Sequence, residues 1–145
     1  MMKEIDKKIT SWLGHHGLTV LRFSIALIFI WFGFLKLIDY SPATNLVKQT
    51  LYWVNLSGFV VFLGLWEMGI GFCFMFRSLI RVGIALLLPQ IIGTFLPLVF
   101  LPEITFQHDS FLIPTLEGQY IIKNLIIIAA AMVIGATVRK HHENI

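Results

Sequence analysis

The chain contains few charged side chains and a single cysteine. Asp, Glu, Lys and Arg make up 13% of its 145 residues, whereas they make up about a quarter of a typical soluble domain. Hydrophobic residues make up 57%. The single cysteine, Cys73, excludes an internal disulfide and a thiol–disulfide relay within the chain, because both need a pair. The shortage of charge, together with long uncharged runs, predicts an integral membrane protein.

The sequence also lacks the usual signatures of enzymes and of nucleic-acid binding. It shows no nucleophile–base pair, no haem-ligand pair in matched spans, no flavin or nicotinamide motif, no phosphate-binding glycine loop and no metal-ligand cluster. The net charge is +3, and the basic residues cluster near predicted helix ends, which indicates membrane topology. We therefore expect no nucleic-acid partner, no metal and no catalytic residue, and a stand-alone enzyme is the least supported function.

Four apolar segments have the length that crosses a bilayer core of about 30 Å. They predict an all-α integral membrane protein whose single membrane domain, residues 17–138, is a four-transmembrane-helix bundle. The predicted spans are residues 17–38, 57–76, 79–101 and 119–138. We expect residues 1–16 to be a cytoplasmic or interfacial segment, partly amphipathic, and residues 139–145 to be a cytoplasmic tail.

Two connectors have local signals of their own. Ser41 before Pro42 is a helix-start signal, and it predicts a short helix on the membrane surface between the first two spans. Residues 102–118 form a polar loop in which Thr105–Phe106 and Phe111–Ile113 are expected to be extended. A loop of this length in a small bundle is typical of a lid that folds back.

The distribution of lysine and arginine predicts the orientation. The ends of the spans on one side carry Lys3, Lys7, Lys8, Arg77, Arg81, Arg139 and Lys140. The loops on the other side contain Lys48, and Lys36 lies just inside that membrane edge. The positive-inside rule then places both termini in the cytoplasm. An even number of spans agrees, because it returns the chain to its starting side.

The second predicted span carries one carboxylate, Glu67, close to its middle. A carboxylate near the bilayer midplane costs roughly 2.5–3.5 kcal/mol, so we expect a partner for it inside the bundle. Gly64 and Gly71 share its helix face, and small residues let a neighbouring helix come close. In the first span, Lys36 shares a face with Gly33 by the same spacing.

The depth of a residue in the membrane can be estimated from its position along the helix, at about 1.5 Å per residue. By this estimate every span contributes at least one polar side chain to the outer half of the bundle. The set is Lys36, Glu67, Gln90 with Thr94, and Lys123 with Tyr120 and Asn124. One interpretation is a buried pocket that opens outward and suits an anion, a quinone carbonyl or a proton-transfer step. The other is a structural ion pair that sets helix register while the second lysine snorkels. The sequence leaves both open, and quinone is the cofactor class that the first interpretation suggests.

Three short motifs in chain order resemble those of a known family. Trp31, Gly33, Lys36 and Tyr40 match a Trp-x-Gly-x-x-Lys signature followed by an aromatic residue; Glu67 with Gly69 and Gly71 matches a Glu-x-x-x-Gly pattern. Residues 118–124, Gly-Gln-Tyr-Ile-Ile-Lys-Asn, match a Gly-(polar)-aromatic-x-x-Lys-Asp signature. From about Leu18 to Arg139, the chain resembles the YkgB-like family of the reactive-chlorine-resistance membrane protein C, which is related to the DoxX-like proteins.

This resemblance implies a multi-pass protein of the bacterial inner membrane that contributes to resistance to reactive chlorine or related oxidative stress. Asn124 stands where the family pattern has an acid, which removes a charge beside Lys123. Two other functions stay open: a small oligomeric transporter or proton-coupled permease, and a non-catalytic membrane anchor subunit of a redox complex. The partners expected from these readings are the lipid bilayer, further copies of the chain and a redox partner subunit.

Overall fold

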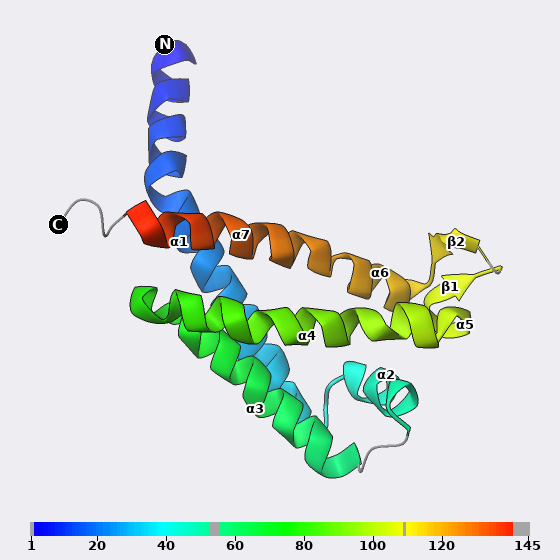
Figure 1. Ribbon diagram of the computed structural model, residues 1–145. Coiled ribbons are helices and arrows are strands. Elements are labelled where there is room, and N and C mark those ends of the chain that lie inside the picture. Colours follow the sequence, from blue (N-terminus) through cyan, green and yellow to red (C-terminus); the bar gives the residue numbers. More distant parts are fainter. Residues whose placement is uncertain (1, 53–55, 109, 141–145) are drawn as a thin grey trace.

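The chain is almost wholly helical in the computed structural model, which describes residues 2–52, 56–108 and 110–140 (Figure 1). The helices are α1 (Met2–Leu37), α2 (Ala43–Thr50), α3 (Leu56–Met75), α4 (Ile80–Phe100), α5 (Pro102–Thr105), α6 (Leu116–Ile122) and α7 (Asn124–Lys140), with a 3-10 turn, η1, at Arg77–Leu79. Strands β1 (Phe106–Gln107) and β2 (Ser110–Pro114) pair antiparallel.

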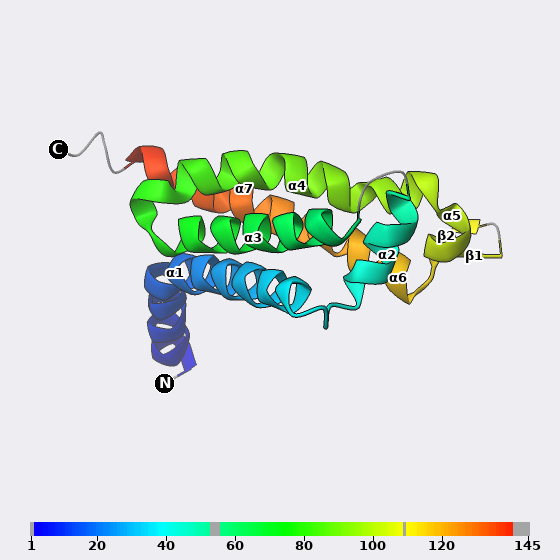
Figure 2. The same cartoon turned by 90° about the horizontal axis from the view of Figure 1, so that it is seen from below.

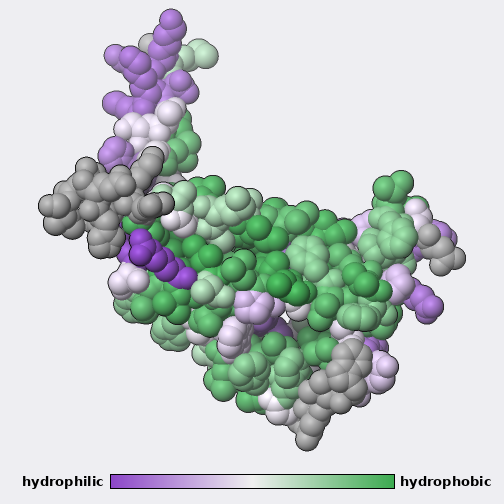
Figure 3. Space-filling view, viewed as in Figure 1, coloured by the Kyte–Doolittle hydropathy of each residue, from purple (hydrophilic) through white to green (hydrophobic). Residues whose placement is uncertain are grey.

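Within the described residues, four helical segments are long and apolar enough to cross a membrane. They are Met2–Leu37, Gly58–Met75, Arg77–Phe100 and Leu116–Val138. The outer surface of the bundle is apolar, as Figure 3 shows for one face. Val99 is 75% exposed and Ile92 67% exposed, for example. Monomeric soluble proteins rarely expose apolar surface on this scale, so the surface fits a multi-pass membrane protein. The predicted helical class and the number of candidate spans are confirmed.

The first helix begins earlier than predicted, at Met2 instead of residue 17. No proline interrupts the chain between these positions, and the apolar residues of the N-terminal segment already recur at helical spacing. The segment is therefore continuous with the first helix, and it projects away from the other helices (Figures 1 and 2). α1 ends where Asp39 adopts a positive φ of 57° and the amide of Tyr40 donates to the carbonyl of Leu35 at 3.0 Å.

The fourth candidate span, Leu116–Val138, includes the whole predicted span 119–138 and has a break between α6 and α7. It begins at Leu116, because the hydroxyl of Thr115 caps α6 by accepting a hydrogen bond from the amide of Gly118 at 3.2 Å. The division falls at Lys123, where the side-chain amide of Asn124 donates to two backbone carbonyls of the preceding turn. α7 then continues through Lys140, into the predicted tail, of which residues 141–145 lie outside the described residues.

The two connectors largely have the predicted structure. α2 confirms a short helix after Pro42, and β1 and β2 confirm extended structure at Phe106 and at Phe111–Ile113. Thr105 instead ends α5, because both its amide and its hydroxyl donate to the carbonyl of Leu101. A surface position for α2 and a lid role for the hairpin stay predictions.

The candidate spans pack in the cyclic order α1, α3, α4 and α7, with α7 also in contact with α1. The start of α1, the end of α7 and the turn between α3 and α4 lie at one end of the bundle, whereas α2 and the hairpin lie at the other (Figures 1 and 2). Arg77 and Arg81 are therefore at the same end as the N-terminal lysines, as the predicted topology requires.

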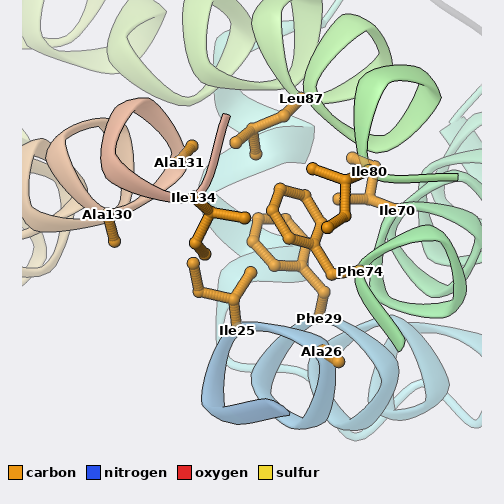
Figure 4. Packing of buried hydrophobic residues seen from close by; sticks show 10 residues of the cluster. All are labelled: Ile25, Ala26, Phe29, Ile70, Phe74, Ile80, Leu87, Ala130, Ala131 and Ile134. Carbon is orange, nitrogen blue, oxygen red and sulfur yellow. The ribbon is translucent and has the colours of Figure 1, made fainter. Parts of the chain in front are cut away.

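The apolar core lies toward the end of the bundle that carries the start of α1 and the end of α7. Side chains from all four spans point toward one another there (Figure 4). Phe74 and Ile70 of α3 are fully buried at its centre. The remaining members of the cluster are Ile25, Ala26, Phe29, Ile80, Leu87, Ala130, Ala131 and Ile134.

Glycines bring α1 and α3 into backbone contact. A Cβ atom added at Gly33 would lie 2.5 Å from the carbonyl oxygen of Gly64, and one added at Gly64 would lie 2.7 Å from the carbonyl oxygen of Gly33. A Cβ atom added at Gly71 would likewise lie 2.7 Å from the carbonyl oxygen of Ala26. The closest helix pair in the bundle thus depends on residues without side chains.

Replacing one of these glycines by alanine is expected to separate the two helices. Gly64→Ala places a methyl group against backbone atoms that cannot rotate away, and we expect a destabilisation of about 1–3 kcal/mol. Gly69→Ala on the same helix is the matched control, because no neighbouring atom lies within 4 Å of the added Cβ. Thermal unfolding of the purified variants in detergent measures both effects. Equal unfolding temperatures for the two variants would contradict the close contact.

Candidate functional site

The carboxylate of Glu67 is buried between three helices, and both of its oxygens accept hydrogen bonds. Lys36 Nζ, from the last turn of α1, lies 2.6 Å from Oε2. Gln90 Nε2, from the middle of α4, donates to Oε1 at 2.6 Å. Lys36 and Glu67 are each only 7% exposed. We call Lys36, Glu67 and Gln90 the polar triad. The partner that the sequence predicted for Glu67 is in place.

The glycine contact between α1 and α3 determines where the lysine can reach. A Cβ atom added at Gly64 would lie 3.2 Å from the Cβ of Lys36, so the base of the lysine side chain lies directly on the α3 backbone. Gly64 precedes Glu67 by one helical turn and shares its face. Lys36 therefore turns inward along α3 to the carboxylate, although it lies near the end of its own helix.

Two further hydrogen bonds lie next to the triad, and one of them joins α3 to α4. The hydroxyl of Thr94 donates to the backbone carbonyl of Gln90 at 2.9 Å, one turn further along α4. The indole of Trp66 donates to the carbonyl of Leu86 at 3.1 Å and so ties α3 to α4 next to Glu67. Trp66 was not among the candidate residues predicted from the sequence. The sequence did contain a signal for its role. An indole N–H within an apolar span needs a hydrogen-bond partner, because it is removed from water.

The polar residues of the fourth predicted span lie apart from the triad. Lys123 is exposed, and its Nζ lies 5.4 Å from the centroid of the Tyr120 ring. The side-chain amide of Asn124 is occupied by the carbonyls of Tyr120 and Ile121, at 3.1 Å each. The described contacts of these three candidate residues are thus made within α6 and α7. They favour the interpretation in which the second lysine snorkels.

The triad borders the apolar core on the side away from the start of α1 and the end of α7. Glu67 lies one turn before Ile70 on α3, and Gln90 lies one turn after Leu87 on α4. The cluster of buried apolar side chains (Figure 4) therefore lies between the triad and that end. This position agrees with the predicted placement of the polar set toward the opposite side.

The triad is chemically a compensated charge pair with an added amide donor. An ammonium group has three N–H donors, and the hydrogen bonds among the described residues use one of those on Lys36. A small anion or a carbonyl oxygen that reached Lys36 would find donors there and would compete with Glu67 for them. A neutral apolar molecule would gain nothing there.

No family model, no curated protein and no solved structure matches this chain. The family resemblance drawn from the three motifs therefore stays a prediction. The structure adds the positions of the motif residues. Lys36 of the first motif pairs with Glu67 of the second. Gly33 and Gly71 each lie against the backbone of the other helix, at Gly64 and at Ala26, whereas Trp31 is 58% exposed. These residues form one contact between two helices that are candidate membrane spans.

Proposed function

We propose that this chain is a small bacterial inner-membrane protein of the YkgB/DoxX-like type that contributes to resistance to reactive chlorine or related oxidative stress. In this proposal the polar triad is the part of the molecule on which protection depends. The observation that carries it is the contact between Lys36 and Glu67. These are the charged residues of two separate motifs, 31 positions apart, and they hydrogen-bond to each other inside the bundle.

The proposed ligand of the triad is a small anionic or quinone-like molecule that enters from the periplasmic side. The spare N–H donors of Lys36 suit a negative or carbonyl oxygen. The apolar cluster lies on the other side of the triad, which favours a one-sided site over a path through the bundle. This arrangement supports a binding protein more than it supports a transporter.

The proposed orientation has both termini in the cytoplasm. Lys3, Lys7 and Lys8 of α1 lie at the same end of the bundle as Arg77 and Arg81, and the positive-inside rule assigns such an end to the cytoplasm. The triad then opens toward the periplasm, where an oxidant from outside the cell would first arrive.

The orientation can be read from cysteine labelling in cells, in a Cys73→Ser background. We expect a membrane-impermeant maleimide to label Lys48→Cys, on the exposed face of α2, in intact spheroplasts. Lys3→Cys should react only after the membrane is permeabilised. The opposite pattern would place the termini outside and would overturn the proposed entry side.

The stress role can be tested by measuring survival under hypochlorous acid in a strain that lacks the gene. We expect the wild-type chain to restore survival, whereas Lys36→Met and Glu67→Gln should lower it at least about tenfold, because each removes one charge of a buried pair. Lys48→Met is the matched control, since Lys48 is an exposed lysine remote in sequence from the triad.

Membrane abundance of every variant must be measured alongside survival. If Lys36→Met and Glu67→Gln accumulate normally and protect as well as wild type, the triad is a structural ion pair and the ligand proposal fails. If the wild-type chain gives no protection, the stress role itself fails, and the four-helix architecture stands without it.

A further inference from the structure

A second polar site lies at the opposite end of the bundle from α2, away from the triad. α1, η1 and α7 enclose a small cavity there, about 50 Å³ in volume. One water molecule needs roughly 10–15 Å³ of such space, so the cavity holds more than a single water. Its polar lining consists of Thr19, Arg22, Arg77 and Thr137, and Ile134 belongs to its apolar wall.

Among the described residues, no acidic group lines this cavity to balance its charge. Two guanidinium groups line it. The Nε atom of Arg22 is buried and has no hydrogen-bond partner among the described residues. The guanidinium carbon of Arg22 lies 5.1 Å from the centroid of the Phe23 ring. A buried donor without a partner costs free energy, and two like charges at one cavity add repulsion.

The position of the cavity in the bundle indicates the class of ligand that it suits. It lies where α1 enters the bundle, beside the first residue of α4, Ile80, and within the last turn of α7. η1, the start of α4 and the end of α7 meet here, and in a membrane-spanning bundle such an end lies near the lipid headgroups. The planar fork of arginine matches the oxygens of a phosphate group, and basic pockets between spans on the cytoplasmic side typically bind anionic headgroups.

We propose that this cavity is a binding site for a phosphate group, held by Arg22 and Arg77. The buried Nε of Arg22 donates to a phosphate oxygen, and the guanidinium of Arg77 closes the site from the exposed turn between α3 and α4. The phosphate belongs either to an anionic phospholipid or to a free phosphate ion, and both present the same oxygens to the two arginines. The site is independent of the triad and of the proposed stress role.

The test is a titration of the purified full-length protein in a neutral detergent, followed by thermal unfolding. The two probes are short-chain phosphatidylglycerol, compared with short-chain phosphatidylcholine, and inorganic phosphate, compared with chloride at equal ionic strength. We expect phosphatidylglycerol or phosphate to raise the unfolding temperature in a saturable way. Stabilisation by the lipid alone assigns the site to a headgroup, and stabilisation by both probes shows that the phosphate group suffices.

Three variants separate this site from general charge attraction. Arg22→Gln and Arg77→Gln should each weaken the apparent affinity about tenfold or more, because a charge-assisted hydrogen bond is lost. Arg81→Gln is the matched control, since Arg81 is exposed at the same end but does not line the cavity. Arg77 is also exposed, so its variant should fold even if Arg22→Gln does not. The proposal is overturned if neither probe stabilises the wild-type chain, or if Arg81→Gln weakens binding as much as Arg77→Gln.

Discussion

A carboxylate in the middle of an apolar helix is the constraint on which this bundle depends. Glu67 must be compensated, because an ionised group without partners in a membrane span is costly. The compensation comes from two other helices, through Lys36 of α1 and Gln90 of α4. One side chain thereby fixes the relative position of three of the four candidate spans. Since bilayer tails are as apolar as the helix surfaces, such polar contacts and close packing hold spans together where the hydrophobic effect does not.

The glycines of α1 and α3 and the ion pair depend on each other. Without the backbone contact between Gly33 and Gly64, the lysine near the end of α1 would lie too far from the middle of α3. Without the ion pair, Lys36 would extend to the membrane surface, as lysines near helix ends usually do. The apolar cluster around Phe74 then closes the bundle on one side of the triad. Structure and proposed function therefore meet at one place, because the same contact that orders the helices holds the ammonium of Lys36, with its spare donors, against Glu67.

Much of this arrangement could be predicted from the sequence, because its causes are local. Segment length and hydropathy predict the spans, and a buried charge predicts its partner, which is why Lys36 and Gln90 were identified. Depth along a helix does not say which way a side chain points. Lys123 has a similar depth, but it lies at the break between α6 and α7 and turns to the Tyr120 ring. The role of Trp66 was also missed, since its acceptor is a backbone carbonyl that no sequence pattern marks.

The most direct measurement of the central claim is a double-mutant cycle on Lys36 and Glu67 in the purified protein, followed by equilibrium unfolding. Each single variant, Lys36→Met or Glu67→Leu, leaves an unpaired buried charge and should cost about 3–5 kcal/mol. The double variant removes both charges, so it should be clearly more stable than the sum of the two losses predicts. Such a coupling would confirm that the pair holds α1 against α3. Additive losses would contradict it, because they would mean that the two side chains do not interact in the folded protein.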